Sequence, residues 1–286
     1  MKSKKKKSNL LSFALLILGL AIIAYPIFSQ WYYKIDANNV IARYETATSE
    51  LDQAELQRKW DLALAYNHTL DPSRLADPWT NKEKEGVAEY ARMLEVNEQI
   101  GYIEIPKISQ KLPIYAGTSE NVLQKGAGHL EGTSLPTGGP STHSVITAHR
   151  GLPTAELFTS LDKMEEGDIF YIHVLNRVLA YKVDLIQVVE PSNFDPVLVV
   201  EGHDYSTLLT CTPYSINTHR LLVRGERTDY DPAVEEKAIR DNFINNNYKY
   251  YLLASSLVIL VLIVLIYLLR KKIKALYKKI IGLRGK

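Results

Sequence analysis

Two long apolar runs, one near each end of the chain, constrain its topology more than any other feature of the sequence. Residues 10–28 and 251–269 are each 19 residues long and almost wholly apolar. As a helix, such a run reaches about 28 Å, which is close to the hydrocarbon thickness of a bilayer. The sequence therefore predicts two transmembrane helices, with the residues between them on one side of a cell membrane.

Basic residues outside both runs predict the orientation. Residues 1–9 carry five lysines and residues 270–286 carry eight Lys or Arg, and neither segment has an acidic residue. Because positive flanks stay in the cytoplasm, both termini are predicted to be cytoplasmic and the middle of this multi-pass chain extracellular. A cleaved signal peptide is the alternative for the first run, but no A-x-A-like site follows it, which favours an uncleaved anchor.

Charge and cysteine content exclude several functions. When the 13 basic residues of the two flanks are set aside, 21 basic residues remain against 32 acidic ones, a formal charge of −11. An acidic exterior segment argues against a nucleic-acid partner. The only cysteine, Cys211, has no second thiol for a disulfide or a zinc site, and no acidic run of the calcium-binding kind is present. We therefore predict no metal and no cofactor.

The predicted secondary structure changes along the exterior segment. Residues 29–70 read as a helical arm, residues 71–86 as a loop with two Asp-Pro pairs, and residues 229–250 as a linker. Between them, residues 87–228 contain short strand-like runs and helical patches near 119–124 and 155–165. The strand-like runs are YIEIP, LPIYAG, HSVITAH, DIFYIHVL, VLAYKVDLIQVVE, STLLTC and RLLVRGE. This pattern predicts a mainly β fold, a closed or nearly closed barrel of seven or eight strands.

The thiol lies at the end of a predicted strand. Thr212 and Pro213 stop the strand that holds Cys211, and the chain enters another strand near Arg220. If Cys211 and Arg220 face each other across this hairpin, their Cβ atoms lie roughly 4.5–5.5 Å apart. A guanidinium in that place favours a thiolate and donates to a developing oxyanion. Thr210, beside the thiol, is a secondary candidate.

A thiol nucleophile also needs a proton carrier. His149 ends the apolar strand of SVITAHRG and is the first choice among seven histidines, and His129 in the Gly-rich GAGHLEG is the second. A structural interpretation stays open on spacing alone. A single strand cysteine is often a small buried apolar residue, and an arginine near it often pairs with an acid.

Three motifs together resemble the sortases, the cysteine transpeptidases of Gram-positive cell surfaces. They are ITAHRG, TLLTC and NTHRLLVRG, and the likeness covers residues from about 75 to 228. It implies an eight-stranded sortase-type barrel in which Cys211 attacks a backbone carbonyl, His149 is the general acid and base, and Arg220 stabilises the tetrahedral intermediate. The implied substrate is an LPXTG-like sorting signal, cut between Thr and Gly, whose thioacyl intermediate is resolved by an amine.

Two features resemble the pilin-polymerising class, class C. One is the second apolar run, and the other is the DPW tripeptide, Asp77, Pro78 and Trp79, which is similar to the lid of that class. In that lid Asp77 would pair with Arg220 and Trp79 would cover Cys211. The implied partners are pilin subunits with such signals and an acceptor pilin lysine. Two alternatives stay open: a housekeeping-type sortase that anchors proteins to cell-wall peptide, and a non-catalytic, membrane-tethered pilin-binding scaffold.

Overall fold

A computed structural model describes most of the central part of the chain. It covers residues 2–70 and 93–242, together with residues 251–252, 254–260, 262, 266, 269–270 and 273. Contacts divide the chain into two compact units, Met1–Ala238 and Ile239–Lys286. The first unit contains the barrel and every site discussed below.

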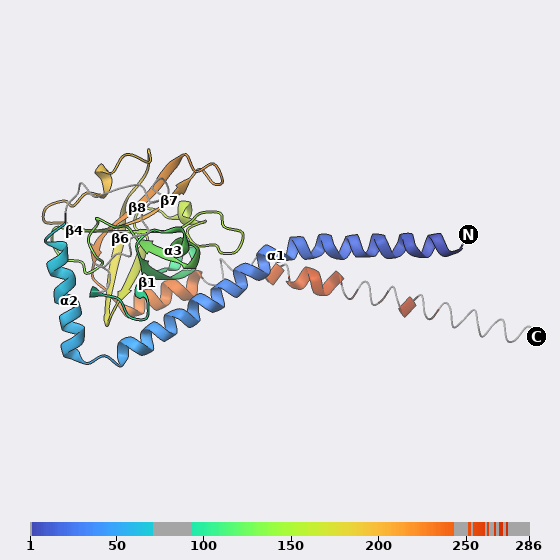
Figure 1. Cartoon of the computed structure of the whole chain (residues 1–286), viewed down its shortest axis with the longest axis horizontal. Coiled ribbons are helices and arrows are strands. Elements are labelled where there is room, and N and C mark those ends of the chain that lie inside the picture. The colour runs from blue at the N-terminus through green and yellow to red at the C-terminus, as the bar shows by residue number, and fades with distance from the viewer. Residues whose placement is uncertain are drawn as a thin grey trace, which may run out of the picture. The chain divides into compact units, whose positions relative to one another are not determined.

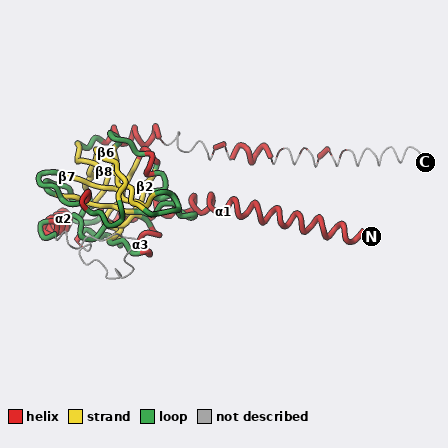
Figure 2. The backbone as a smooth tube through the Cα atoms, turned by 90° about the horizontal axis from the view of Figure 1, so that it is seen from above, coloured by secondary structure: helices red, strands yellow, loops and turns green. Residues whose placement is uncertain are grey.

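The fold is a closed barrel of eight strands, as the sequence predicted (Figures 1 and 2). Neighbouring strands follow the order β1-β2-β3-β4-β7-β8-β6-β5, and β5 pairs with β1 to close the barrel. The strands are β1 Gln99–Ile105, β2 Gln110–Ala116, β3 Ala127–His129, β4 Thr142–Thr147, β5 Ile169–Val174, β6 Arg177–Val189, β7 Asp204–Thr212 and β8 His219–Thr228. Closure leaves no sheet edge among these strands.

Two parallel pairs, β2–β3 and β4–β7, join the otherwise antiparallel barrel. Most strand residues are buried, and β4 and β7 are buried along almost their whole length. Both faces of these two strands are therefore covered, and polar side chains such as His143 and Thr207 are buried together with apolar ones. The β4–β7 pair matters most for the site, because it brings two distant segments to the same end of the barrel.

Helices cover the outside of the barrel and connect its strands. The long ones are α1 Lys2–Ser49 and α2 Gln53–Asn67, and the short ones are α3 Glu120–Lys125, η3 Pro106–Ile108, η4 Leu161–Lys163 and η5 Asp195–Val197. The predicted helical arm is therefore two helices, and Asp52 begins the second by accepting a 2.7 Å hydrogen bond from Glu55 N. Residues 232–242, predicted as linker, are also helical.

The structure does not confirm the prediction of two transmembrane helices. In the parts of the chain that the structure describes, no helix is long and apolar enough to cross a membrane. The spans at residues 10–28 and 251–269 therefore stay a prediction.

One hydroxyl fastens α1 to the barrel. The side chain of Tyr44 is buried, and its oxygen accepts a 2.7 Å hydrogen bond from Leu175 N and lies 3.4 Å from Ile100 O. Replacing Tyr44 with phenylalanine leaves the buried Leu175 N–H without this acceptor, which costs about 1–3 kcal/mol of unfolding free energy. Urea unfolding of the full chain in detergent micelles measures the loss. Tyr32 on the same helix is exposed, so Tyr32→Phe is the matched control, and equal effects of the two variants would contradict the assignment.

Candidate active site

The β7–β8 hairpin places the thiol and the guanidinium side by side. Cys211 and Arg220 are direct partners across the two antiparallel strands, and each is 5% exposed. Directly opposed strand residues hold their Cβ atoms about 4.5–5.5 Å apart. Arg220 Nη1 donates to the carbonyls of Asn217 (3.1 Å) and His219 (3.0 Å), which fixes the plane of the guanidinium. The predicted pairing of Cys211 with Arg220 is therefore present.

The β4–β7 register brings His149 to the same end of the barrel. Thr147 of β4 is the partner of Leu209 in β7, in a parallel pair. His149 lies two residues beyond Thr147, and Cys211 two residues beyond Leu209, so both leave the pair at the same end. The His149 side chain is 15% exposed, which keeps it at the rim rather than in the core.

Glu120 is a site residue that the sequence did not reveal. It is the first residue of α3, and its carboxylate oxygens lie 3.3 Å from His149 Nε2. A carboxylate on one ring nitrogen orients an imidazole and fixes which nitrogen it presents elsewhere. Glu120 precedes His149 by 29 residues, and no local pattern connects the two. The sequence predicted only the helix that carries it.

Thr210 and His129, the two secondary candidates, have structural partners. Thr210 is fully buried, and its hydroxyl donates to Ala148 O at 2.8 Å, which ties β7 to the segment that carries His149. His129 is also fully buried, and its Nε2 donates to Ser134 O at 2.7 Å. Burial lowers the pKa of His129 to about 4, although the Ser134 hydrogen bond opposes the shift. This is the environment of a neutral structural histidine, which argues against His129 as the proton carrier.

The buried histidines predict a loss of stability in acid. Burial also lowers the pKa of His143 to about 4, and this ring bonds Leu198 O and the Thr207 hydroxyl. Because both folded pKa values lie below the unfolded value of about 6.5, their contribution is complete above pH 6.5 and is lost as the pH falls towards 4. Each histidine adds up to about 1.4 kcal/mol per pH unit in that window.

Denaturant unfolding between pH 7.5 and 4.5 measures this slope. His143→Gln is expected to flatten the pH dependence even though it also lowers stability at every pH. His68 is exposed, so His68→Gln is the control and should leave the slope unchanged. A slope for His143→Gln equal to that of the unmodified protein would contradict the prediction.

Three side chains outside this end of the barrel have the chemistry of a metal site. The ligand atoms of Glu104, His173 and Glu235 lie within 4.8 Å of one another. Glu235 already accepts hydrogen bonds from His173 Nε2 (3.0 Å) and Tyr230 (2.6 Å), and these hold the helical residues 232–238 against the barrel. Hydrogen bonds within the chain account for His173 and Glu235, so the group gives no reason to invoke a metal.

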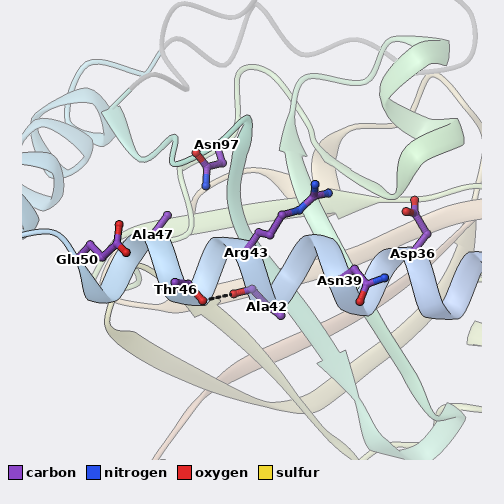
Figure 3. A pocket seen from close by; sticks show the side chains of 8 residues that line it. All are labelled: Asp36, Asn39, Ala42, Arg43, Thr46, Ala47, Glu50 and Asn97. Atoms are coloured by element: carbon purple, nitrogen blue, oxygen red, sulfur yellow. Dashed lines mark hydrogen bonds between the residues drawn. The ribbon is translucent and has the colours of Figure 1, made fainter.

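A polar groove lies along α1, apart from the thiol (Figure 3). Its lining comes from one face of α1 and from Asn97, and the lining side chains belong to Asp36, Asn39, Ala42, Arg43, Thr46, Ala47, Glu50 and Asn97. None of the predicted catalytic residues lines it. The candidate site at the end of β4 and β7 is therefore separate from this groove.

The predicted lid falls outside the described residues. Asp77, Pro78 and Trp79 belong to residues 71–92, which the structure does not describe. Their role therefore stays a prediction.

A closed β-barrel with a thiol, an imidazole and a guanidinium at one end is suited to thiol-dependent acyl transfer. A sortase-domain model matches residues 103–228. A solved sortase C of Streptococcus pneumoniae, described in terms of catalysis and pilin substrate specificity, is 64% identical, with a TM-score of 0.65 over 67% of this chain and 97% of that one. A pilus-related sortase C of group B Streptococcus is 59% identical, with a TM-score of 0.64 over 66% of this chain and 97% of that one.

More distant relatives that match the chain are also sortases. Sortase SrtE1 of Streptomyces coelicolor is 29% identical over 178 residues, which are 58% of this chain and 49% of the relative. Sortase A of Bacillus anthracis is 22% identical over 227 residues, 78% of this chain and 96% of the relative. The chain therefore belongs to the sortase family of transpeptidases, and the solved structures it resembles at 52–64% identity are sortases C.

Proposed function

We propose that this sortase polymerises pilins: it cleaves an LPXTG-like signal between Thr and Gly and joins the threonine to a lysine amine of another pilin. The observation that carries the proposal is the meeting of Cys211, Arg220 and His149 at one end of the barrel. The pilus-related sortase C that the chain resembles supports the choice of pilin.

The geometry suits a two-step acyl transfer. The Cys211 thiolate attacks the threonine carbonyl carbon, and Arg220 stabilises the negative oxygen of the tetrahedral intermediate. His149 gives a proton to the departing glycine nitrogen as the C–N bond breaks, which leaves a thioester. A lysine amine then attacks the thioester and loses a proton to His149, and the thiolate leaves. Glu120, 3.3 Å from the imidazole, orients the ring through both steps.

The acceptor amine separates pilin polymerisation from cell-wall anchoring. Both reactions use the same three residues, so the site alone does not choose between them. The test gives the full chain in detergent micelles one pilin donor with equal amounts of a pilin lysine acceptor and a cell-wall cross-bridge peptide. Mass spectrometry of the products is expected to show pilin–pilin amide bonds. Exclusive consumption of the cross-bridge peptide would support the anchoring function instead.

A non-catalytic scaffold is the alternative of another class. In a scaffold, Cys211 would be only a packed core residue. The proposed function instead needs a thiol that becomes acylated by the substrate. Incubation with the sorting-signal peptide and no acceptor separates the two. Trapping of a thioester on Cys211 supports the enzyme, and a protein that binds the peptide but never gains its mass supports the scaffold.

We also propose that residues 10–28 and 251–269 hold the enzyme in the cell membrane with both termini in the cytoplasm. Support comes from their apolar length, their basic flanks and the described side chains. Leu15, Leu18 and Ile22 of α1 are more than half exposed, as are Leu257 and Val258. A row of exposed large apolar groups is favourable in lipid and costly in water. Protease protection of tagged termini in intact cells tests the orientation.

A further inference from the structure

Hydrogen bonds connect the sequence neighbours of His149 to those of Cys211. Ala148 N donates to Leu209 O at 3.3 Å, and Ala148 O accepts from the Thr210 hydroxyl at 2.8 Å. On the other side, Arg150 Nη1 donates to the Thr212 hydroxyl at 3.0 Å. The residues before and after the imidazole are therefore bonded to the residues before and after the thiol. One of these three bonds joins backbone groups, and the other two use the Thr210 hydroxyl and the Arg150 side chain.

The Arg150 guanidinium joins three segments at once. Besides Thr212, its Nε donates to Thr159 O at 3.2 Å, and its Nη2 lies 2.7 Å from Asp162 Oδ2. The Arg150 side chain is 7% exposed, whereas that of Asp162 is 52% exposed. A planar guanidinium forms several hydrogen bonds in fixed directions, which an ammonium does not reproduce. Arginine at position 150 therefore fixes the directions of these hydrogen bonds and also supplies a positive charge.

Residues 149–151, which follow β4, also form hydrogen bonds to residues 158–159. Phe158 N donates to His149 O at 3.1 Å, and Gly151 N donates to the Thr159 hydroxyl at 3.1 Å. Residues 149–151 are thus fixed to residues 158–159, and Arg150 connects this folded segment to the end of β7. Without the bond to Thr212, the segment that carries His149 is no longer hydrogen-bonded to the residue that follows Cys211.

We propose that Arg150 is a positioning residue for the transpeptidation, which holds the imidazole of His149 at its working distance from the Cys211 thiol through Thr212. The inference rests on the proposed roles of Cys211 and His149. Misplacement of a reacting group by about 1 Å can cost about 10²-fold in rate, so the loss of one tether has a measurable effect on turnover. Because the guanidinium of Arg150 acts through its bonds to Thr212, Thr159 and Asp162, we expect the effect on kcat rather than on KM.

A matched pair of variants at Thr212 tests the tether. Valine has the shape of threonine but accepts no hydrogen bond, and serine keeps the hydroxyl. The assay follows an LPXTG-containing peptide and a lysine amide acceptor with the full chain in micelles. Thr212→Val is expected to lower kcat about 10-fold with KM within about twofold, while Thr212→Ser stays near the unmodified protein. Arg150→Lys is expected to lower kcat at least as much as Thr212→Val.

Asp162→Asn separates positioning from stability. It removes the charge of the exposed partner but leaves the Arg150–Thr212 hydrogen bond. If Arg150 positions the imidazole, kcat of Asp162→Asn stays within about twofold even where its thermal midpoint falls as far as that of Thr212→Val. Values of kcat that simply follow the thermal midpoints across these variants would overturn the inference.

Two further outcomes distinguish the inference from the proposed function. If the unmodified protein turns the peptide over and Thr212→Val does so equally well, Arg150 is not a positioning residue, while the proposed function stands. If the unmodified protein forms no thioester and no product, the proposed function fails and the inference fails with it.

Discussion

Replacement of Cys211 with alanine is expected to abolish pilin polymers and leave the barrel intact. The thiol is the only group in the proposed reaction that forms a covalent bond to the substrate, so no other residue of the described site replaces it. Loss of a covalent nucleophile costs more than about 10³-fold in rate. Purified pilin mixed with the variant in micelles should give monomer only on a denaturing gel, where the unmodified enzyme gives a ladder.

The control is the fold of the variant itself. Cys211 is 5% exposed at the end of β7, and alanine removes one sulfur atom without introducing a polar group. The thermal midpoint should therefore change by a few degrees at most. Serine at the same position keeps a hydroxyl but is a weaker nucleophile, and it should also be inactive. Persistent ladders with Cys211→Ala would show that the acyl transfer does not pass through this sulfur.

The sequence predicted the barrel because most of its strands are long enough to show a pattern. Seven apolar or alternating runs correspond to seven of the eight strands. The missed strand, β3, is Ala127–His129, three residues centred on Gly128. Gly128 serves a close approach, since a Cβ there would lie 2.3 Å from Gly117 O. A short strand defined by a backbone contact has no periodicity to detect.

The site, too, was predicted only where local sequence determines the contact. Cys211 and Arg220 were paired from the sequence because a short hairpin joins them, and strand register follows from local chain geometry. The contact of Glu120 with His149 depends on how α3 packs beside β2 and β3, which no local pattern encodes. For Arg150, the sequence shows a basic residue beside His149 but not its bond to Thr212. Tertiary packing, rather than residue type, assigns these roles.

Arg220→Lys is expected to give the second large loss, with a different kinetic signature. The two carbonyl hydrogen bonds of Nη1, to Asn217 and His219, hold the planar group opposite Cys211. Lysine keeps the positive charge but has no planar fork, so the charge is no longer fixed beside the developing oxyanion. Loss of one preorganised oxyanion donor costs about 10²–10³-fold in kcat, with little change in KM when the interaction forms only in the transition state.

Arg224 provides the matched control on the same strand. It lies four residues beyond Arg220, on the same face of β8, and pairs with Asp184 at 2.6 Å over the ring of Tyr205. Arg224→Lys should therefore weaken an ion pair and lower stability, with kcat within about twofold. Single-turnover kinetics of peptide cleavage compare the two variants. If the losses in kcat are equal, the effect comes from general weakening of β8; a loss confined to Arg220→Lys assigns stabilisation of the oxyanion to the guanidinium opposite the thiol.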